Sequence, residues 1–154
     1  MLRQFIVILI IFILVPISNA YSQTAFSLVP DKTAITTALI KEPIVFKGQG
    51  FSPNEPVTIE ILVPDTLKIK GQTEGSNRVG IGVGIADEKG SFETPMGALT
   101  TLNTLFQVGW TKEMTPDFKQ ASPLPVGKYT IIATGVESDK ESTNVLEILP
   151  APKE

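Results

Sequence analysis

The stretch GQGFSPNEPVTIEIL, from Gly48 to Leu62, joins a turn to a strand. Its two glycines relax the end of the preceding segment, and Ser52-Pro53-Asn54 is typical turn chemistry. Pro56 then stands just before the strand, where a missing N–H costs little. From Val57 onward every second residue is apolar and β-branched, which predicts a strand with one buried face. Because the stretch contains no nucleophile with a base and no cage of metal ligands, we interpret it as a corner between two strands.

Short runs of the same kind occur along much of the chain, each bounded by Pro, Gly, Asn or Asp. They predict strands near residues 25–30, 34–40, 43–49, 57–63, 78–86, 128–135 and 143–149. Several short strands separated by turns, with little helix, indicate an all-β fold, an antiparallel β-sandwich of about seven strands. With 154 residues, the chain is long enough for one such domain.

Residues 1–20 have the pattern of a secretory signal peptide. Arg3 precedes the apolar run FIVILIIFILV, Pro16 closes that run, and Ser18-Asn19-Ala20 supplies the small residues of a cleavage site. We therefore expect export to the periplasm, the cell surface or the medium, with one domain over residues 21–154 and no stable membrane anchor after cleavage. The alternative is a retained anchor, although the run falls short of the about 20 apolar residues that a bilayer requires.

The composition excludes several classes of function. The net charge is −3 and no Lys/Arg cluster occurs, so neither nucleic acid nor an anionic membrane surface is an expected partner. Cys and His are both absent, which rules out disulfides, His-based triads and Cys/His zinc sites. We expect no cofactor and no metal.

Carboxylates are the remaining candidates for acid–base chemistry. They are scattered over strand and turn positions, at Glu60, Asp65, Asp87, Glu88 and Glu93. The residues from Asp87 to Glu93 could bind calcium weakly, but they lack the alternating oxygen ligands of an EF-hand and fit a hairpin turn better. A small hydrolase is therefore the least favoured hypothesis, and we expect a protein that is not an enzyme.

Three segments of the chain resemble secreted bacterial and archaeal Ig-like (fibronectin-III-like) β-sandwich modules. The segments are GQGFSPNEPVTIEI, ADEKGSFET and LPVGKYTIIATGVESDKESTNVLEI. The residues that carry the resemblance are Gly48, Gly50, Phe51, Pro53, Glu55, Val57, Asp87, Gly90, Phe92, Leu124, Pro125, Gly127 and Tyr129. The resemblance covers roughly residues 43–95 and 123–149 and implies an Ig-like fold. It implies little about function, because such modules serve as spacers, adhesive domains or binding subunits.

The run RVGIGVGIADEKG is not generic. Val79, Ile81, Val83 and Ile85 alternate with Gly80, Gly82, Gly84 and Ala86, which predicts a strand with one bulky apolar face and one nearly bare face. Interior glycines mark close approach by another backbone, a ring or a ligand. A partner could contact the glycine face, or an aromatic ring of the same chain could cover it. A dinucleotide-binding loop is excluded, since no helix pattern follows.

Residues 95–122 form a second feature, which the resembling modules do not need. The spacing of Leu99, Leu102, Leu105 and Phe106 predicts a short amphipathic helix after Pro95, followed by irregular loop. A connection this long is often functional. Trp110 and Phe118, with Phe106, could contact a glycan or a protein. Alternatively, these side chains cap one end of the sandwich.

These observations predict a non-catalytic exported Ig-like module that binds a protein partner or serves in assembly of the cell envelope or extracellular space. The alternative is a carbohydrate-binding module that uses Trp110. The candidate contact residues are Gly80, Gly82, Gly84, Phe106, Trp110 and Phe118.

Overall fold

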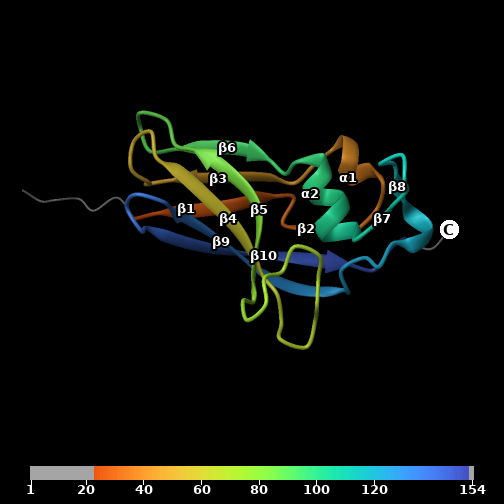
Figure 1. Ribbon diagram of the computed structural model, residues 1–154. Coiled ribbons are helices and arrows are strands. Elements are labelled where there is room, and N and C mark those ends of the chain that lie inside the picture. The colour runs from red at the N-terminus through yellow and green to blue at the C-terminus, as the bar shows by residue number, and fades with distance from the viewer. Residues whose placement is uncertain (1–22, 153–154) are drawn as a thin grey trace, which may run out of the picture.

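The structure is mostly β, as predicted, with short helical segments near one end (Figure 1). The computed structural model describes residues 23–152, so the predicted signal peptide lies outside the described residues. The strands are β1 (Ala25–Val29), β2 (Lys32–Ala34), β3 (Val45–Gln49), β4 (Pro56–Leu62), β5 (Arg78–Ile85), β6 (Phe92–Pro95), β7 (Gly109–Trp110), β8 (Pro116–Asp117), β9 (Gly127–Gly135) and β10 (Glu141–Leu149). The helical segments are α1 (Ala38–Lys41), α2 (Ala98–Thr100), the π-helical turn η1 (Thr101–Phe106) and the 3-10 turn η2 (Phe118–Gln120).

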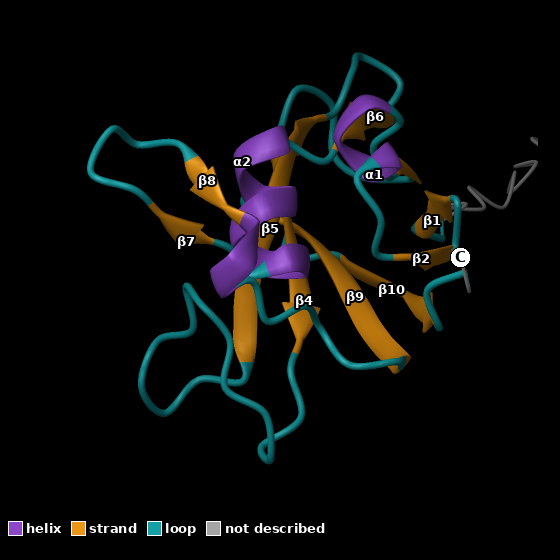
Figure 2. Ribbon diagram, turned by 90° about the vertical axis from the view of Figure 1, so that its right-hand side faces the viewer, coloured by secondary structure: helices purple, strands orange, loops and turns teal. Residues whose placement is uncertain are grey.

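Two sheets pack against each other. One contains three strands in the order β1-β3-β6, and the other contains five in the order β2-β10-β9-β4-β5. All pairs within these two sheets are antiparallel except β2 with β10, which is parallel. Figure 2 shows the larger sheet curling partly round the core, with α2 next to β5. Strand β5 is therefore an edge of the five-stranded sheet.

The predicted strand at 34–40 is wrong. Strand β2 ends at Ala34, and the chain then turns into α1, where the N–H of Leu39 bonds the carbonyl of Thr36. The β-branched residues there favoured a strand, but one helical turn buries Leu39 in the main core and packs Ile40 against a second apolar cluster. Strands β6, β7 and β8 are further differences, because none of them was among the predicted strands.

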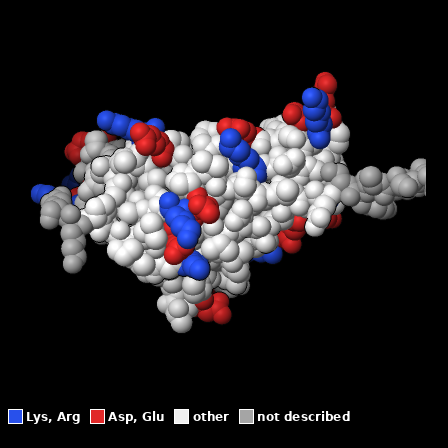
Figure 3. Space-filling view, turned by 180° about the vertical axis from the view of Figure 1, so that it is seen from behind, with Lys and Arg blue, Asp and Glu red and all other residues white. Residues whose placement is uncertain are grey.

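Charged side chains lie on the surface in small groups of mixed sign. Figure 3 shows these groups separated by wide uncharged areas on the rear face. The ion pairs are Lys32–Glu147, Lys47–Glu93 and the contacts of Arg78 with Glu60 and Glu141. Such exposed pairs contribute little to stability, about 0–1 kcal/mol each. The fold therefore depends on its apolar interior.

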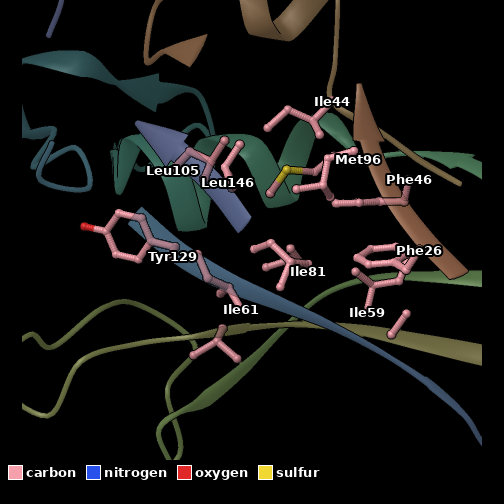
Figure 4. Close-up of a cluster of buried hydrophobic side chains, with 14 of the residues drawn as sticks. Phe26, Ile44, Phe46, Ile59, Ile61, Ile81, Met96, Leu105, Tyr129 and Leu146 are labelled. Carbon is pink, nitrogen blue, oxygen red and sulfur yellow. The ribbon is translucent and has the colours of Figure 1, made fainter. Parts of the chain in front are cut away.

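The main core lies between the two sheets. Alternate residues of β4 and β9 supply its centre, and Val57, Ile59, Ile61 and Ile131 have no exposed surface. Figure 4 shows Phe26 and Phe46 from the smaller sheet facing Ile59 and Ile81 from the larger one, with Leu105 of η1 reaching the same cluster. Period-two burial along these strands is what the sequence predicted.

Glu55 is a fully buried carboxylate at the corner between β3 and β4. Its oxygens accept hydrogen bonds from the Ser52 N–H (2.5 Å), the Ser138 hydroxyl (2.7 Å), and the N–H groups of Ser138 (3.0 Å) and Glu137 (3.1 Å). Burial by itself would raise the pKa of Glu55, but these hydrogen bonds favour the charged form and hold the pKa below its ordinary value. The carboxylate thus ties the β3–β4 corner to the β9–β10 turn.

Replacing this carboxylate should weaken the fold. We expect Glu55→Gln to lower the free energy of unfolding at neutral pH by about 2 kcal/mol or more, because an amide cannot accept four hydrogen bonds. Chemical denaturation followed by circular dichroism measures this. Since the pKa is lower in the folded chain than in the unfolded chain, the contribution is present at pH above the unfolded pKa and is lost as pH falls through the folded pKa. The variant should therefore lose less stability than the wild type on acidification.

Glu137→Gln is the matched control, since Glu137 takes part through its backbone N–H only. Its stability should stay within about 0.5 kcal/mol of the wild type. An equal loss in both variants would contradict the role assigned to Glu55.

Candidate functional site

Strand β5 contains a β-bulge that reverses its two faces. Ile59 of β4 pairs with Gly82 and Glu60 pairs with Gly80, which leaves Ile81 as the extra residue. Before the bulge, Val79 and Ile81 point into the core. After it, Val83 and Ile85 point outward and are 57% and 63% exposed. The prediction that all four residues share one face of the strand is therefore wrong.

The same reversal turns Gly82 and Gly84 inward. A Cβ on Gly84 would lie 2.5 Å from the ring of Phe92, and one on Gly82 would lie 3.4 Å from the ring of Phe46. Rings of the same chain thus cover these two glycines, which is one of the two interpretations drawn from the sequence. Gly80 is different, because it is exposed and nothing lies within 4 Å of a Cβ placed there.

The outer edge of β5 pairs with no other strand of residues 23–152. The N–H of Ala86 bonds the carbonyl of Glu55 on the β4 side, so alternation directs the backbone groups of Ile85 and Val83 away from β4. The Ser76 hydroxyl covers the N–H and the carbonyl of Arg78 at the start of this edge. Beyond Arg78, the edge from residue 79 to residue 86 carries no charged side chain. Strand β6 begins on this side of β5, where the Asp87 N–H bonds the Ser91 carbonyl, and it lies in contact with β5 without pairing with it.

A groove of about 430 Å³ opens where β5 meets the α2–η1 helix. Its lining residues are Lys70, Gly71, Val79, Gly80, Leu99, Thr100, Asn103 and Thr104. The two unusual features of the sequence therefore meet here, the glycine-rich strand on one wall and the inserted helix on the other. The Lys70 ammonium donates a hydrogen bond to the Val108 carbonyl and retains two further donors.

The inserted segment forms a small apolar cluster of its own. Leu102, Phe106 and Val108 are its buried members, and Ile35, Ile40, Trp110 and Ala121 pack against them. The short helix predicted after Pro95 is confirmed, and it continues from α2 into the π-helical turn η1. Its predicted apolar face holds for Leu102, Leu105 and Phe106, which are buried, but not for Leu99, which is 65% exposed. The predicted irregular loop contains a short hairpin, in which Trp110 of β7 pairs with Pro116 of β8.

The aromatic candidates lie together at this cluster. Trp110 is partly buried, and its indole N–H donates to the side-chain oxygen of Asn103 at 2.9 Å. Phe118 is 43% exposed and meets the buried Phe106 edge to face, with ring centroids 5.7 Å apart. Because Asn103 also lines the groove, it connects Trp110 to the wall opposite β5. No pattern in the sequence indicated that Lys70 and Asn103 would contribute to this region.

The acidic candidates have local roles. Glu60 pairs with Arg78, and Glu93 pairs with Lys47. Asp87 accepts from the N–H groups of Ser91 and Lys89, and these bonds lower its pKa. Within residues 23–152, no three acidic side chains gather closely enough to hold a metal ion. Over the same range, none of the helices is long and apolar enough to span a bilayer.

Comparisons with known proteins add no relative. No protein-family model matches the chain, and no curated protein aligns with it significantly.

Two glycines of the same strand give a matched test of the reversed faces. We expect Gly84→Ala to lower the free energy of unfolding by about 1–3 kcal/mol, because the methyl group would overlap the Phe92 ring. Gly80→Ala should stay within about 0.5 kcal/mol, since the space beside it is open. Thermal denaturation of both variants measures this. A larger loss of stability in Gly80→Ala than in Gly84→Ala would contradict the reversal of faces at the bulge.

A second test concerns the aromatic cluster. We expect Trp110→Ala to lower the free energy of unfolding by about 1–2 kcal/mol, because part of the side chain packs against the small cluster of Leu102, Phe106 and Val108. Met114→Ala, at the 75% exposed tip of the same hairpin, should leave stability within about 0.5 kcal/mol. Equal melting temperatures for the Trp110 variant and the wild type would show that the ring is free for a ligand instead.

Proposed function

We propose that this chain is a non-catalytic, exported Ig-like module that binds a protein partner through the exposed apolar side chains of the edge strand β5. The observation that carries the proposal is the exposure of two large apolar side chains, Val83 and Ile85, on one face of the edge strand β5, with an open groove at the other end of the strand. Exposed apolar side chains that cluster on one face can mark a contact site for another protein.

Two details support the Ig-like assignment. The sheet order β10-β9-β4-β5 corresponds to the G-F-C-C′ order of variable-type Ig domains, with the inserted segment between strands E and F. The Tyr129 hydroxyl, near the start of β9, donates to the Pro125 carbonyl four residues upstream at 2.8 Å. This contact matches the tyrosine corner at the start of strand F.

The residue types available support a binding role over catalysis. The chain contains no His and no Cys, so its possible acids and bases are carboxylates, lysines and tyrosines. Glu55, the one fully buried carboxylate among residues 23–152, already accepts four hydrogen bonds. Glu60 and Glu93 are held in ion pairs. These groups serve the fold and leave no acid–base pair in the groove.

Carbohydrate binding at Trp110 is a second proposal with weaker support. A stacking platform needs an exposed ring face, whereas Trp110 packs partly against the second apolar cluster and its N–H is already bonded. Phe118 offers more exposed surface, but its ring also contacts Phe106. Retention on a panel of immobilised glycans, lost in both Trp110→Ala and Phe118→Ala, would favour this role.

The edge-binding proposal can be tested with a photo-cross-linking amino acid. We expect the label at position 83 or 85 to give the same cross-linked product in an envelope extract of the source cells. The label at position 145 is the matched control, because Val145 is 43% exposed on the same sheet but lies on the interior strand β10. Products from all three positions, or from none, would contradict binding at the edge of β5.

A further inference from the structure

Thr104 of η1 carries the clearest sign that the groove beside β5 takes a ligand. The residue is only 4% exposed, and it lines the groove. Its hydroxyl bonds no other group of residues 23–152, yet over that range no fully buried side-chain oxygen or nitrogen lacks a partner. The hydroxyl therefore reaches the groove, where a bound molecule can take the place of water. A nearly buried polar group with no partner in the protein needs such an explanation.

Asn103 presents hydrogen-bond donors on the same wall of the groove. Its Oδ1 accepts from the indole N–H of Trp110 at 2.9 Å. Because an indole N–H can only donate, this contact fixes which end of the amide faces Trp110. The Nδ2 group, with two donors, is the end that stays available. The helical wall thus offers hydroxyl and amide donors side by side.

Lys70 gives the groove a positive charge. Its ammonium is held by the Val108 carbonyl and keeps two further donors. The ion pairs formed within the described part of the chain use Lys32, Lys47 and Arg78, so Lys70 has no acidic partner there. No Asp or Glu lines the groove. An unpaired cation beside several donors favours an anion whose oxygens accept hydrogen bonds.

Apolar surface lies next to these donors. Leu99 is 65% exposed, and it lines the groove together with Val79. Gly80 leaves open space between the walls, since nothing lies within 4 Å of a Cβ placed there. The volume of about 430 Å³ is within the range of small-molecule sites. A bare inorganic anion would leave this apolar surface in contact with water, whereas an organic acid would cover it.

We infer that the groove binds an organic carboxylate that carries a small apolar group. Lys70 and Asn103 would donate to the carboxylate, Thr104 would supply a further hydrogen bond, and Leu99 would cover the apolar group. A free acid and the C-terminal residue of a peptide share this chemistry. The inference does not depend on the proposed protein contact, which uses the other end of β5.

Trp110 supplies the readout for a binding experiment. It is the only Trp in the chain, and its indole N–H bonds Asn103, so one NMR signal reports on the groove. The sample is the isotope-labelled chain purified from cells that express it at full length. N-acetyl-leucine should shift this signal in a saturable way. N-acetyl-leucinamide, which lacks the charge, should bind at least about tenfold more weakly. No saturable shift with the acid would overturn the inference.

Two further probes define the ligand. A tripeptide that ends in a free leucine carboxylate should bind more tightly than N-acetyl-leucine if a peptide end is the source, and no more tightly if a free acid is. Inorganic phosphate should bind more weakly than either acid, because it cannot cover Leu99. Equal binding of phosphate and N-acetyl-leucine would contradict the role of the apolar wall.

Two neighbouring threonines separate a binding role from a structural one. Thr104→Val keeps the shape of the side chain and removes a hydroxyl that bonds nothing in the protein. Its melting temperature should not fall, whereas its affinity for N-acetyl-leucine should fall about threefold to tenfold. In the control Thr101→Val the order is reversed, because the Thr101 hydroxyl donates to the Gly97 carbonyl at 3.1 Å. A Thr104 variant that loses stability and keeps its affinity would contradict the inference.

Charge variants complete the test. Lys70→Met should weaken N-acetyl-leucine at least about tenfold and leave the amide probe unchanged. Lys68→Met is the matched control, because Lys68 lies in the same loop but does not line the groove. Equal losses in both variants would show that only general charge attraction acts. Val83→Glu should leave the affinity unchanged, so failure of the groove and failure of the protein contact are distinguished.

Discussion

The contact between Phe92 and Gly84 is the constraint that decides which residues of β5 face the core and which face outward. The ring can occupy its place only if residue 84 faces the core and has no side chain. Gly84 faces the core because the bulge at Ile81 reverses the strand. The same reversal exposes Val83 and Ile85. Packing of Gly84 against the core on one face of β5 and exposure of Val83 and Ile85 on the other face are thus two results of one extra residue.

Most of the all-β architecture follows from period-two patterns that the sequence displays openly. Val57, Ile59 and Ile61 are buried as their spacing predicts, because nothing interrupts the alternation along β4. The alternation in β5 is just as regular in the sequence, yet it fails at Ile81. A bulge is set by how two strands pair and how Phe92 packs between sheets, and neither can be read from a single run of residues.

The candidate site was only partly predictable for a related reason. The glycine-rich run and the insertion after Pro95 both stood out in the sequence, but their meeting at one groove depends on how the chain folds over. Lys70 comes from a polar loop with no distinguishing pattern, and its position beside Gly80 depends on tertiary structure. The predicted strand at residues 34–40 failed for a different reason. Its β-branched residues favoured a strand, whereas burial of Leu39 required a helical turn.

The division of the interior into two apolar clusters has a consequence for the groove beside β5. Leu105 anchors η1 in the main core, whereas Leu102 and Phe106 belong to the small cluster of the insertion. Local opening of this smaller unit would cost less free energy than global unfolding, because it exposes few buried side chains. It would also shift one wall of the groove while leaving β5 in place. The groove would therefore change shape at temperatures below the melting transition of the two sheets.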